Sequence, residues 1–271
     1  MRRSTMKNEN ADILRQMVRS RYAQTVTGKG CGCTTNAAGG CCGSGSNSIE
    51  QANRLMGYSA EELGSVIDGA NLGLGCGNPT AIGELKPGDV VLDLGSGAGF
   101  DCFLVAKKVG HNGRVIGVDM TPEMLSKARE NAVKMGADNV EFRLGEIEHL
   151  PVADNSVDII ISNCVINLSP EKRLVFQDAY RVLKPGGRLF VSDVVATAEM
   201  PESMREQAAL MTGCIAGAEH IDRIRYYMKE VGFANVKIEL KAHSKELVSR
   251  WFPGSRAENY VASADIRAVK P

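Results

Sequence analysis

Short apolar runs alternate with helix-forming segments along the middle of the chain, and this alternation constrains the fold more than any other feature. Five runs typical of buried strands occupy positions 90–94, 115–118, 140–144, 157–162 and 188–192. Helical segments separate most of them, at 100–109, from Thr121-Pro122 onward and at 170–183. Lys184-Pro185-Gly186-Gly187 should end the last helix, because proline and glycine disfavour its continuation. The pattern predicts an α/β fold: a doubly wound, mostly parallel sheet with helices on both faces.

The segment before these strands has a different character. Residues 7–22 can form an amphipathic helix, with apolar residues at helical spacing: Ile13, Leu14, Met17, Val18 and Tyr22. The stretch 27–48 is rich in glycine, serine, asparagine and cysteine, so we expect a mobile loop there. A further helix should begin near Ser59, where Glu62 completes the spacing of a capping box.

The pattern becomes looser after Ser192. Helical segments at 203–211 and 221–231 are followed by strand-like runs at 236–240 and 260–266. This part predicts the end of the sheet together with an added C-terminal α+β element.

Composition and charge narrow the classes of protein to which the chain can belong. Of its 271 residues, 44% are hydrophobic and 24% are charged, as is ordinary for a soluble globular protein. The net charge is zero, which disfavours nucleic acid or an anionic membrane as a partner. No apolar run approaches the roughly 20 residues of a membrane helix, and the basic N-terminus lacks the apolar stretch of a secretory signal. We therefore expect a cytoplasmic protein whose eight cysteines are mostly free thiols that bind metal or metalloid, do redox work or are simply buried.

A glycine-rich turn, Asp93-Leu94-Gly95-Ser96-Gly97-Ala98-Gly99, directly follows the first predicted strand. Glycines let a ligand approach the backbone, and the helix that begins at Phe100 offers free N–H groups to an anionic group. Asp119 ends the next strand, where a carboxylate can bind ribose hydroxyls, and Glu146 follows the third strand, where it can reach an adenine edge. The combination predicts a nucleotide-type cofactor, and the G-x-G-x-G spacing favours S-adenosylmethionine over a nicotinamide dinucleotide.

Three cysteines stand beside glycine or asparagine in segments that we expect to be irregular: Cys76, Cys164 and Cys214. Any one of them could simply be a small buried side chain, as we expect for Cys102 on the apolar face of its helix. Cys164 follows the fourth strand, so it should face the ligand crevice at the carboxyl ends of the strands. Three thiolates together suit a soft, thiophilic centre.

The cysteines of the N-terminal segment allow more than one role. The sequence has no C-x-x-C pair, which disfavours a zinc ribbon or a redox dithiol. Metal binding, electron relay and simple exposure to solvent stay open for Cys31, Cys33, Cys41 and Cys42.

Several of these motifs resemble those of the class I methyltransferases: the turn at 93–99, Gly117-Val118-Asp119 and the run 181–187. The resemblance implies S-adenosylmethionine as the methyl donor and a Rossmann-like, seven-stranded sheet whose last strand runs antiparallel. The run 232–236 would be the turn before the closing strands. The resemblance also implies a set of cofactor-binding residues: Asp93, Gly95, Ser96, Gly97, Gly99, Asp119, Met120, Glu146, Ile147 and Asn163.

The cysteine-bearing segments are more specific and resemble the arsenite methyltransferases. The runs 75–79, 119–124, 163–168 and 213–217 match that family in order. The resemblance implies that Cys76, Cys164 and Cys214 bind trivalent arsenic, which is the substrate. It also implies a thiol reductant of the thioredoxin or glutathione type and an N-terminal cysteine in a disulfide relay, a role that falls to Cys41 or Cys42.

On this basis we expect the chain to divide into three parts. Residues 1–48 form the N-terminal helix and the cysteine-rich segment, 49–195 the S-adenosylmethionine-binding domain, and 196–271 an arsenic-binding region that completes the sheet. We expect a monomer that takes arsenite and methylarsenite as small-molecule substrates, without nucleic acid or membrane as a partner.

The implied reaction needs no general base. The lone pair of trivalent arsenic, held by three thiolates, attacks the donor's methyl group and has no proton to lose, so catalysis is chiefly positioning. Reduction by thiols must follow, so a disulfide within the site is an expected intermediate. Two alternatives stay open: a class I methyltransferase of a small organic substrate, such as a quinone or sterol-like ring, and a thiol-based metalloid sensor without transfer.

Overall fold

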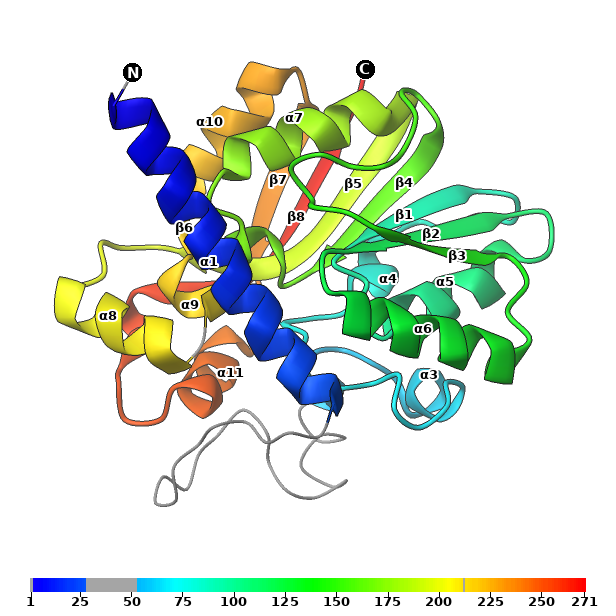
Figure 1. Cartoon of the computed structure of the whole chain (residues 1–271), viewed down its shortest axis with the longest axis horizontal. Coiled ribbons are helices and arrows are strands. Elements are labelled where there is room, and N and C mark those ends of the chain that lie inside the picture. The colour runs from blue at the N-terminus through cyan, green and yellow to red at the C-terminus, as the bar shows by residue number, and fades with distance from the viewer. Residues whose placement is uncertain (1, 28–52, 212) are drawn as a thin grey trace.

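A mixed β-sheet forms the centre of the molecule (Figure 1). The computed structural model describes residues 2–27, 53–211 and 213–271. Its strands are β1 Val90–Leu94, β2 Arg114–Asp119, β3 Val140–Leu144, β4 Val157–Asn163, β5 Leu183–Ala196, β6 Glu219–His220, β7 Ala234–Leu240 and β8 Val261–Val269. They follow the order β3-β2-β1-β4-β5-β8-β7, with the short β6 paired to β5. The first five strands pair in parallel and β8 runs antiparallel to both neighbours, which confirms the predicted sheet with its antiparallel closing strand.

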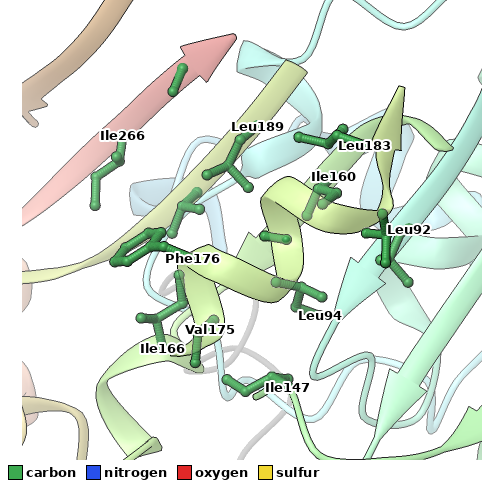
Figure 2. Close-up of a cluster of buried hydrophobic side chains, with 14 of the residues drawn as sticks. Leu92, Leu94, Ile147, Ile160, Ile166, Val175, Phe176, Leu183, Leu189 and Ile266 are labelled. Carbon is green, nitrogen blue, oxygen red and sulfur yellow. The ribbon is translucent and has the colours of Figure 1, made fainter. Parts of the chain in front are cut away.

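Helices cover both faces of this sheet, as the alternation predicts (Figure 1). α5 (Phe100–Val109) and α6 (Pro122–Met135) pack on one face, and α7 (Lys172–Val182) and α10 (Ile221–Val231) pack on the other. Because side chains alternate along a strand, β1 contributes to both cores. Val91 packs with α5 and α6, whereas Leu92 and Leu94 belong to the core that contains Phe176 of α7 (Figure 2).

Local sequence signals set the ends of several elements. The predicted capping box begins α3 (Ala60–Gly64): Ser59 Oγ accepts from Glu62 N at 3.0 Å, and the Glu62 carboxylate accepts from Ser59 N at 3.1 Å. α6 begins at Pro122 after its cap Thr121. The run 184–187 does end α7, but it belongs to β5, which begins earlier than predicted because Leu183 already pairs with Val157 of β4.

The N-terminal helix, α1 (Arg2–Thr27), is longer than predicted, and its buried face is different. Val18 is buried, but Ile13, Leu14 and Met17 are exposed, so the prediction of one apolar face is wrong for these three. The helix lies beside α6 (Figure 1), and its covered stripe contains Arg15. Apolar periodicity misplaced the face because a polar side chain takes part in the contact.

Smaller elements complete the fold: α4 Pro79–Ile82, α8 Glu202–Met211, α9 Gly213–Ala216, α11 Ser244–Trp251 and the 3₁₀ turns η1 Ile166–Leu168 and η2 Ala257–Asn259. The sequence pattern does not predict α11. Within the described ranges, no helix is long and apolar enough to cross a membrane. The segment expected to be a mobile loop, with its four cysteines, lies outside the described residues except for its first residue, and the three-part division of the chain stays a prediction.

Candidate functional site

A pocket lies at the carboxyl ends of β1, β2 and β4, where a doubly wound sheet places its ligand crevice. Eight of the residues predicted to bind the cofactor line it: Asp93, Gly95, Ser96, Gly97, Asp119, Met120, Ile147 and Asn163. Gly99 is the N-cap of α5 and does not line the pocket. Glu146 does not line it either, because its carboxylate pairs with Arg15 Nε at 3.4 Å and Arg19 Nη2 at 3.7 Å. Gly145, Ile147 and Glu148 form that part of the wall.

The glycine loop is tied to the neighbouring strand. The N–H groups of Gly95 and Ser96 donate to Val118 O at 2.8 and 3.0 Å. Gly95 and Gly97 have φ angles of +70° and +51°, which favour glycine, and a Cβ at Gly95 would collide with Val165. The loop therefore needs these glycines to present its backbone to the pocket.

Asp119 is fixed in the direction of the pocket by the same loop. Its Oδ2 accepts from Gly97 N at 3.0 Å and its Oδ1 from Thr121 N at 2.8 Å. Burial raises the pKa of the Asp119 carboxyl above its ordinary value, although these two hydrogen bonds oppose the shift. The Thr121 side chain also hydrogen-bonds the carboxylate, whose remaining lone-pair capacity can accept hydrogen bonds from a ligand.

Within the described residues, two buried polar groups of the pocket wall, on Ser96 and Asn53, have no hydrogen-bond partner. Ser96 is 7% exposed and Asn53 is 3% exposed, and both line the pocket. Neither Ser96 Oγ nor Asn53 Nδ2 has a hydrogen-bond partner in the described part of the chain. Because an unsatisfied buried polar group costs about 1–3 kcal/mol, such groups indicate that a polar ligand completes the site. The pocket thus fits a nucleoside-type cofactor.

Helix α1 forms one side of the pocket, a role that its sequence did not predict. Arg15, Val18 and Tyr22 line the pocket from this helix. Arg15 Nη2 donates to Glu148 Oε1 at 3.0 Å and to Glu171 Oε2 at 3.2 Å. The Glu148 carboxylate is buried and also accepts from Ser169 Oγ at 2.6 Å. These ion pairs hold α1 across the pocket.

The three cysteines singled out by the sequence converge beside this pocket. Their Sγ atoms all lie within 4.8 Å of one another, close enough to contact a single atom. Cys76 is in the irregular segment 71–78, here named the Cys76 loop. Cys164 follows β4 and also lines the pocket, and Cys214 is in α9. We call these three residues the thiol cluster. Its position confirms the expectation that Cys164 faces the crevice.

Backbone contacts bring the members of the cluster together. Cys164 has a φ of +59°, and its N–H donates to Ser192 O of β5 at 2.8 Å. Cys214 Sγ donates to Cys164 O at 3.2 Å. Cys76 and Cys164 are almost completely buried, at 4% and 3% exposure, whereas Cys214 is partly exposed.

Cys76 and Cys164 form a disulfide in this structure, with their Cα atoms 5.4 Å apart. The expectation of mostly free thiols therefore does not extend to these two cysteines in this structure. The reason is geometric, because two cysteines that converge on one metalloid atom are also within disulfide range of each other. A disulfide within the site agrees with the intermediate expected from the sequence. Cys102 is buried as predicted, and its Sγ donates to Asp93 Oδ2 at 3.2 Å.

A buried polar network lies between the pocket and the Cys76 loop. Tyr58 Oη donates to Asp101 Oδ1 at 2.7 Å, and both residues line the pocket. Burial raises the pKa of the Asp101 carboxyl to about 6 and raises that of the Tyr58 hydroxyl. Sequence reasoning missed Asn53, Tyr58, Asp101 and the residues of α1. They belong to no recognisable motif, and an acidic residue in the first turn of a helix is too common to be a signal.

Comparisons with known proteins agree with this geometry. A family model described as "Methyltransferase domain" matches residues 85–232. An arsenite methyltransferase from Halobacterium salinarum is 51% identical over 99% of this chain, which spans 71% of that protein. An arsenite methyltransferase from Aquipseudomonas alcaligenes is 43% identical over 60% of this chain, which spans about half (49%) of its length. The crystal structure of an arsenic (III) S-adenosylmethionine methyltransferase from Chlamydomonas reinhardtii is 35% identical with a TM-score of 0.59, over 82% of this chain and 73% of that one.

The sheet order, the glycine loop and Asp119 at the end of β2 together define a class I S-adenosylmethionine-dependent methyltransferase. The thiol cluster beside the pocket narrows the class, and the relatives carry the narrower name. The chain belongs to the arsenite methyltransferase family.

Proposed function

We propose that this chain transfers a methyl group from S-adenosylmethionine to trivalent arsenic, with arsenite and methylarsenite as substrates. The observation that carries the proposal is the position of the thiol cluster: three Sγ atoms within 4.8 Å of one another, with Cys164 in the wall of the cofactor pocket. Thiolates suit a thiophilic centre, and the shared wall supports a position of that centre next to the donor site.

Residues of the pocket have distinct roles in holding the cofactor. The Asp119 carboxylate accepts from ribose hydroxyls, and the unpartnered Ser96 Oγ and Asn53 Nδ2 pair with polar groups of the ligand. Met120 and Ile147 supply apolar walls. When bound, S-adenosylmethionine supplies an electrophilic methyl group on a sulfonium. The contact of Glu146 with adenine stays a prediction, since Glu146 pairs with arginines of α1.

The thiol cluster holds the acceptor and also stores electrons. Cys76, Cys164 and Cys214 replace the hydroxyl groups of arsenite, which leave as water with the thiol protons, and the arsenic lone pair stays available as the nucleophile. Methylation leaves arsenic pentavalent, and two electrons return it to the trivalent state. Two thiolates of the cluster supply them: their bonds to arsenic break as the two sulfurs join in a disulfide, and the third thiolate keeps the methylated arsenic. The Cys76–Cys164 disulfide supports this step.

An external thiol of the thioredoxin or glutathione type then reduces the disulfide, and Cys41 or Cys42, outside the described residues, relays the exchange. We place the protein in the cytoplasm, where such reductants are abundant, as a monomer. Its balanced charge favours small molecules over nucleic acid or a membrane as partners.

Incubation with arsenite, methyl-labelled S-adenosylmethionine and a thiol reductant tests the proposal. Labelled methylarsenicals are expected and should disappear when arsenite is left out. Arsenite binding without any labelled product would instead indicate a metalloid sensor. Transfer of label to a quinone or sterol-like acceptor, but not to arsenite, would indicate a methyltransferase of organic substrates.

A further inference from the structure

Asn163, the last residue of β4, lies between the cofactor pocket and the Cys76 loop. Its Oδ1 accepts from the N–H of Cys76 at 2.8 Å. Its Nδ2 is 2.8 Å from Gly77 O, 2.9 Å from Tyr58 Oη and 3.1 Å from Asp101 Oδ2. The side chain therefore holds the residue after Cys76 as well as Cys76 itself.

The surroundings determine which way the amide points. The Nδ2 position faces a carbonyl, a carboxylate and a hydroxyl that already donates to Asp101, so only a donor fits there. The Oδ1 position faces an N–H group, so only an acceptor fits. A rotation of the amide by half a turn would break every one of these hydrogen bonds, because it would put oxygen against oxygen and N–H against N–H.

The Cys76 loop is shaped to receive this amide. A Cβ at Gly75 would lie 2.7 Å from Asn163 Nδ2, so a side chain at that position would displace the amide. The carbonyl of Cys76 accepts from Ser263 Oγ at 2.9 Å. Side chains of the sheet thus bind both the N–H and the carbonyl of Cys76. Asn163, which lines the pocket, binds the N–H.

From this geometry we infer that Asn163 is a positioning residue for the thiol cluster: it holds Cys76 Sγ against Cys164. Tyr58 and Asp101 in turn orient the amide of Asn163. The resemblance assigns Asn163 to cofactor binding, which stays a prediction, and its Nδ2 donors are used within the protein. The inference rests on the proposed function for its arsenic readout, and a second readout is independent of arsenic.

The first test measures binding by Asn163→Ala in the full chain, with fully reduced protein. We expect the Kd for arsenite to rise about 10-fold, since a hydrogen bond that fixes Cys76 is lost. Asn139→Ala is the matched control: Asn139 donates to Ala106 O and Gly110 O, away from the pocket, so its loss should lower the melting temperature without changing arsenite affinity.

A double-mutant cycle with Cys76→Ser separates positioning from a general loss of structure. If Asn163 acts through Cys76, Asn163→Ala should weaken arsenite binding by less than about 2-fold in the Cys76→Ser background. An undiminished 10-fold effect in that background would overturn the inference, as would wild-type arsenite affinity in Asn163→Ala.

The second readout is the rate at which Cys76 and Cys164 form a disulfide in oxidised glutathione, followed by peptide mapping. We expect Asn163→Ala to slow it about 10-fold, and an unchanged rate would refute the positioning role. If Asn163→Ala does not fold, Tyr58→Phe removes only the orienting hydroxyl, and it should slow the reaction about 3-fold. A protein that fails to methylate arsenite but shows these rate effects would refute the proposed function and leave the positioning role standing.

Discussion

The cofactor pocket and the thiol cluster are neighbours, yet they are built in different ways. The glycine-loop side of the pocket rests on one local motif: the loop after β1, the start of α5 and the end of β2 lie close in sequence and hold one another by backbone hydrogen bonds. The thiol cluster takes one residue each from the Cys76 loop, the end of β4 and α9, which are far apart in the chain. The pocket can therefore be recognised from a short stretch of sequence, whereas the thiol cluster exists only in the folded sheet.

Cys164→Ser should have the largest effect on the thiol cluster relative to the cofactor pocket. Cys164 is the member of the cluster that also lines the pocket, so its loss should remove the arsenic site and leave the loop at 93–99 intact. We expect methylation to fall by at least about 100-fold while the Kd for S-adenosylmethionine changes less than about 3-fold. Arsenite turnover that survives in this variant would contradict the three-thiolate model.

A variant of Asp193 tests what fixes the turn that follows Cys164. This buried carboxylate of β5 accepts from the N–H of Ile166 at 3.0 Å and from Asn167 Nδ2 at 2.9 Å, which fixes the turn after Cys164. Burial raises the pKa of the Asp193 carboxyl to about 6 from its ordinary 3.8. Between these values the folded chain binds more protons than the unfolded chain, so the stability that this group contributes is full below pH 3.8 and is lost as the pH rises through 6.

The contribution of Asp193 amounts to at most about 3 kcal/mol of unfolding free energy, or roughly 100-fold in the unfolding constant. Asp193→Asn should therefore flatten the profile of unfolding free energy against pH between 4 and 6, measured by urea denaturation. An unchanged slope would mean that Asp193 does not titrate in that window.

Asp119→Ala acts on the pocket alone. Losing a carboxylate that can accept from ribose should raise the Kd for S-adenosylmethionine about 30-fold, with arsenite affinity unchanged. Calorimetry with each ligand measures both effects. Asp138→Ala, an exposed position before β3, serves as the control and should change neither. Equal losses of both affinities would show that the two regions are not separable.

Arg15→Gln should have the smallest effect. It weakens the ion pairs of α1 with Glu148 and Glu171, so we expect the Kd for S-adenosylmethionine to rise about 3-fold, less at high salt. Fluorescence titration over a range of salt concentrations measures it. Arg225→Gln on α10, which pairs with Asp222, should leave the affinity unchanged. An equal effect of both variants would argue against a specific role of α1.

The sequence predicts the buried strands and helices of the sheet well, but it predicts the contacts that assemble the thiol cluster only in outline. Strand β1 and helix α10 have the bounds expected from periodicity, because local patterning suffices for buried elements. The residues themselves indicated that the three cysteines suit one soft centre, but the contacts that set their geometry, such as Asn163 to Cys76, depend on the register of the whole sheet. α1 and α11 show the other limit. Arg15 takes part in the contact of α1, and Ser244 is buried beside Leu247 in α11, so periodicity alone misplaces the first helix and misses the second.

The deep burial of Cys76 and Cys164 has a consequence for which ions the cluster retains. Three thiolates bound to a trivalent metalloid ion form an electrically neutral complex, so its burial away from water carries no cost of desolvating a net charge. A divalent ion such as zinc would leave a net negative charge there, at a desolvation cost of several kcal/mol. The low solvent access of the cluster thus favours trivalent over divalent ions. Zinc should compete poorly with arsenite in a direct titration.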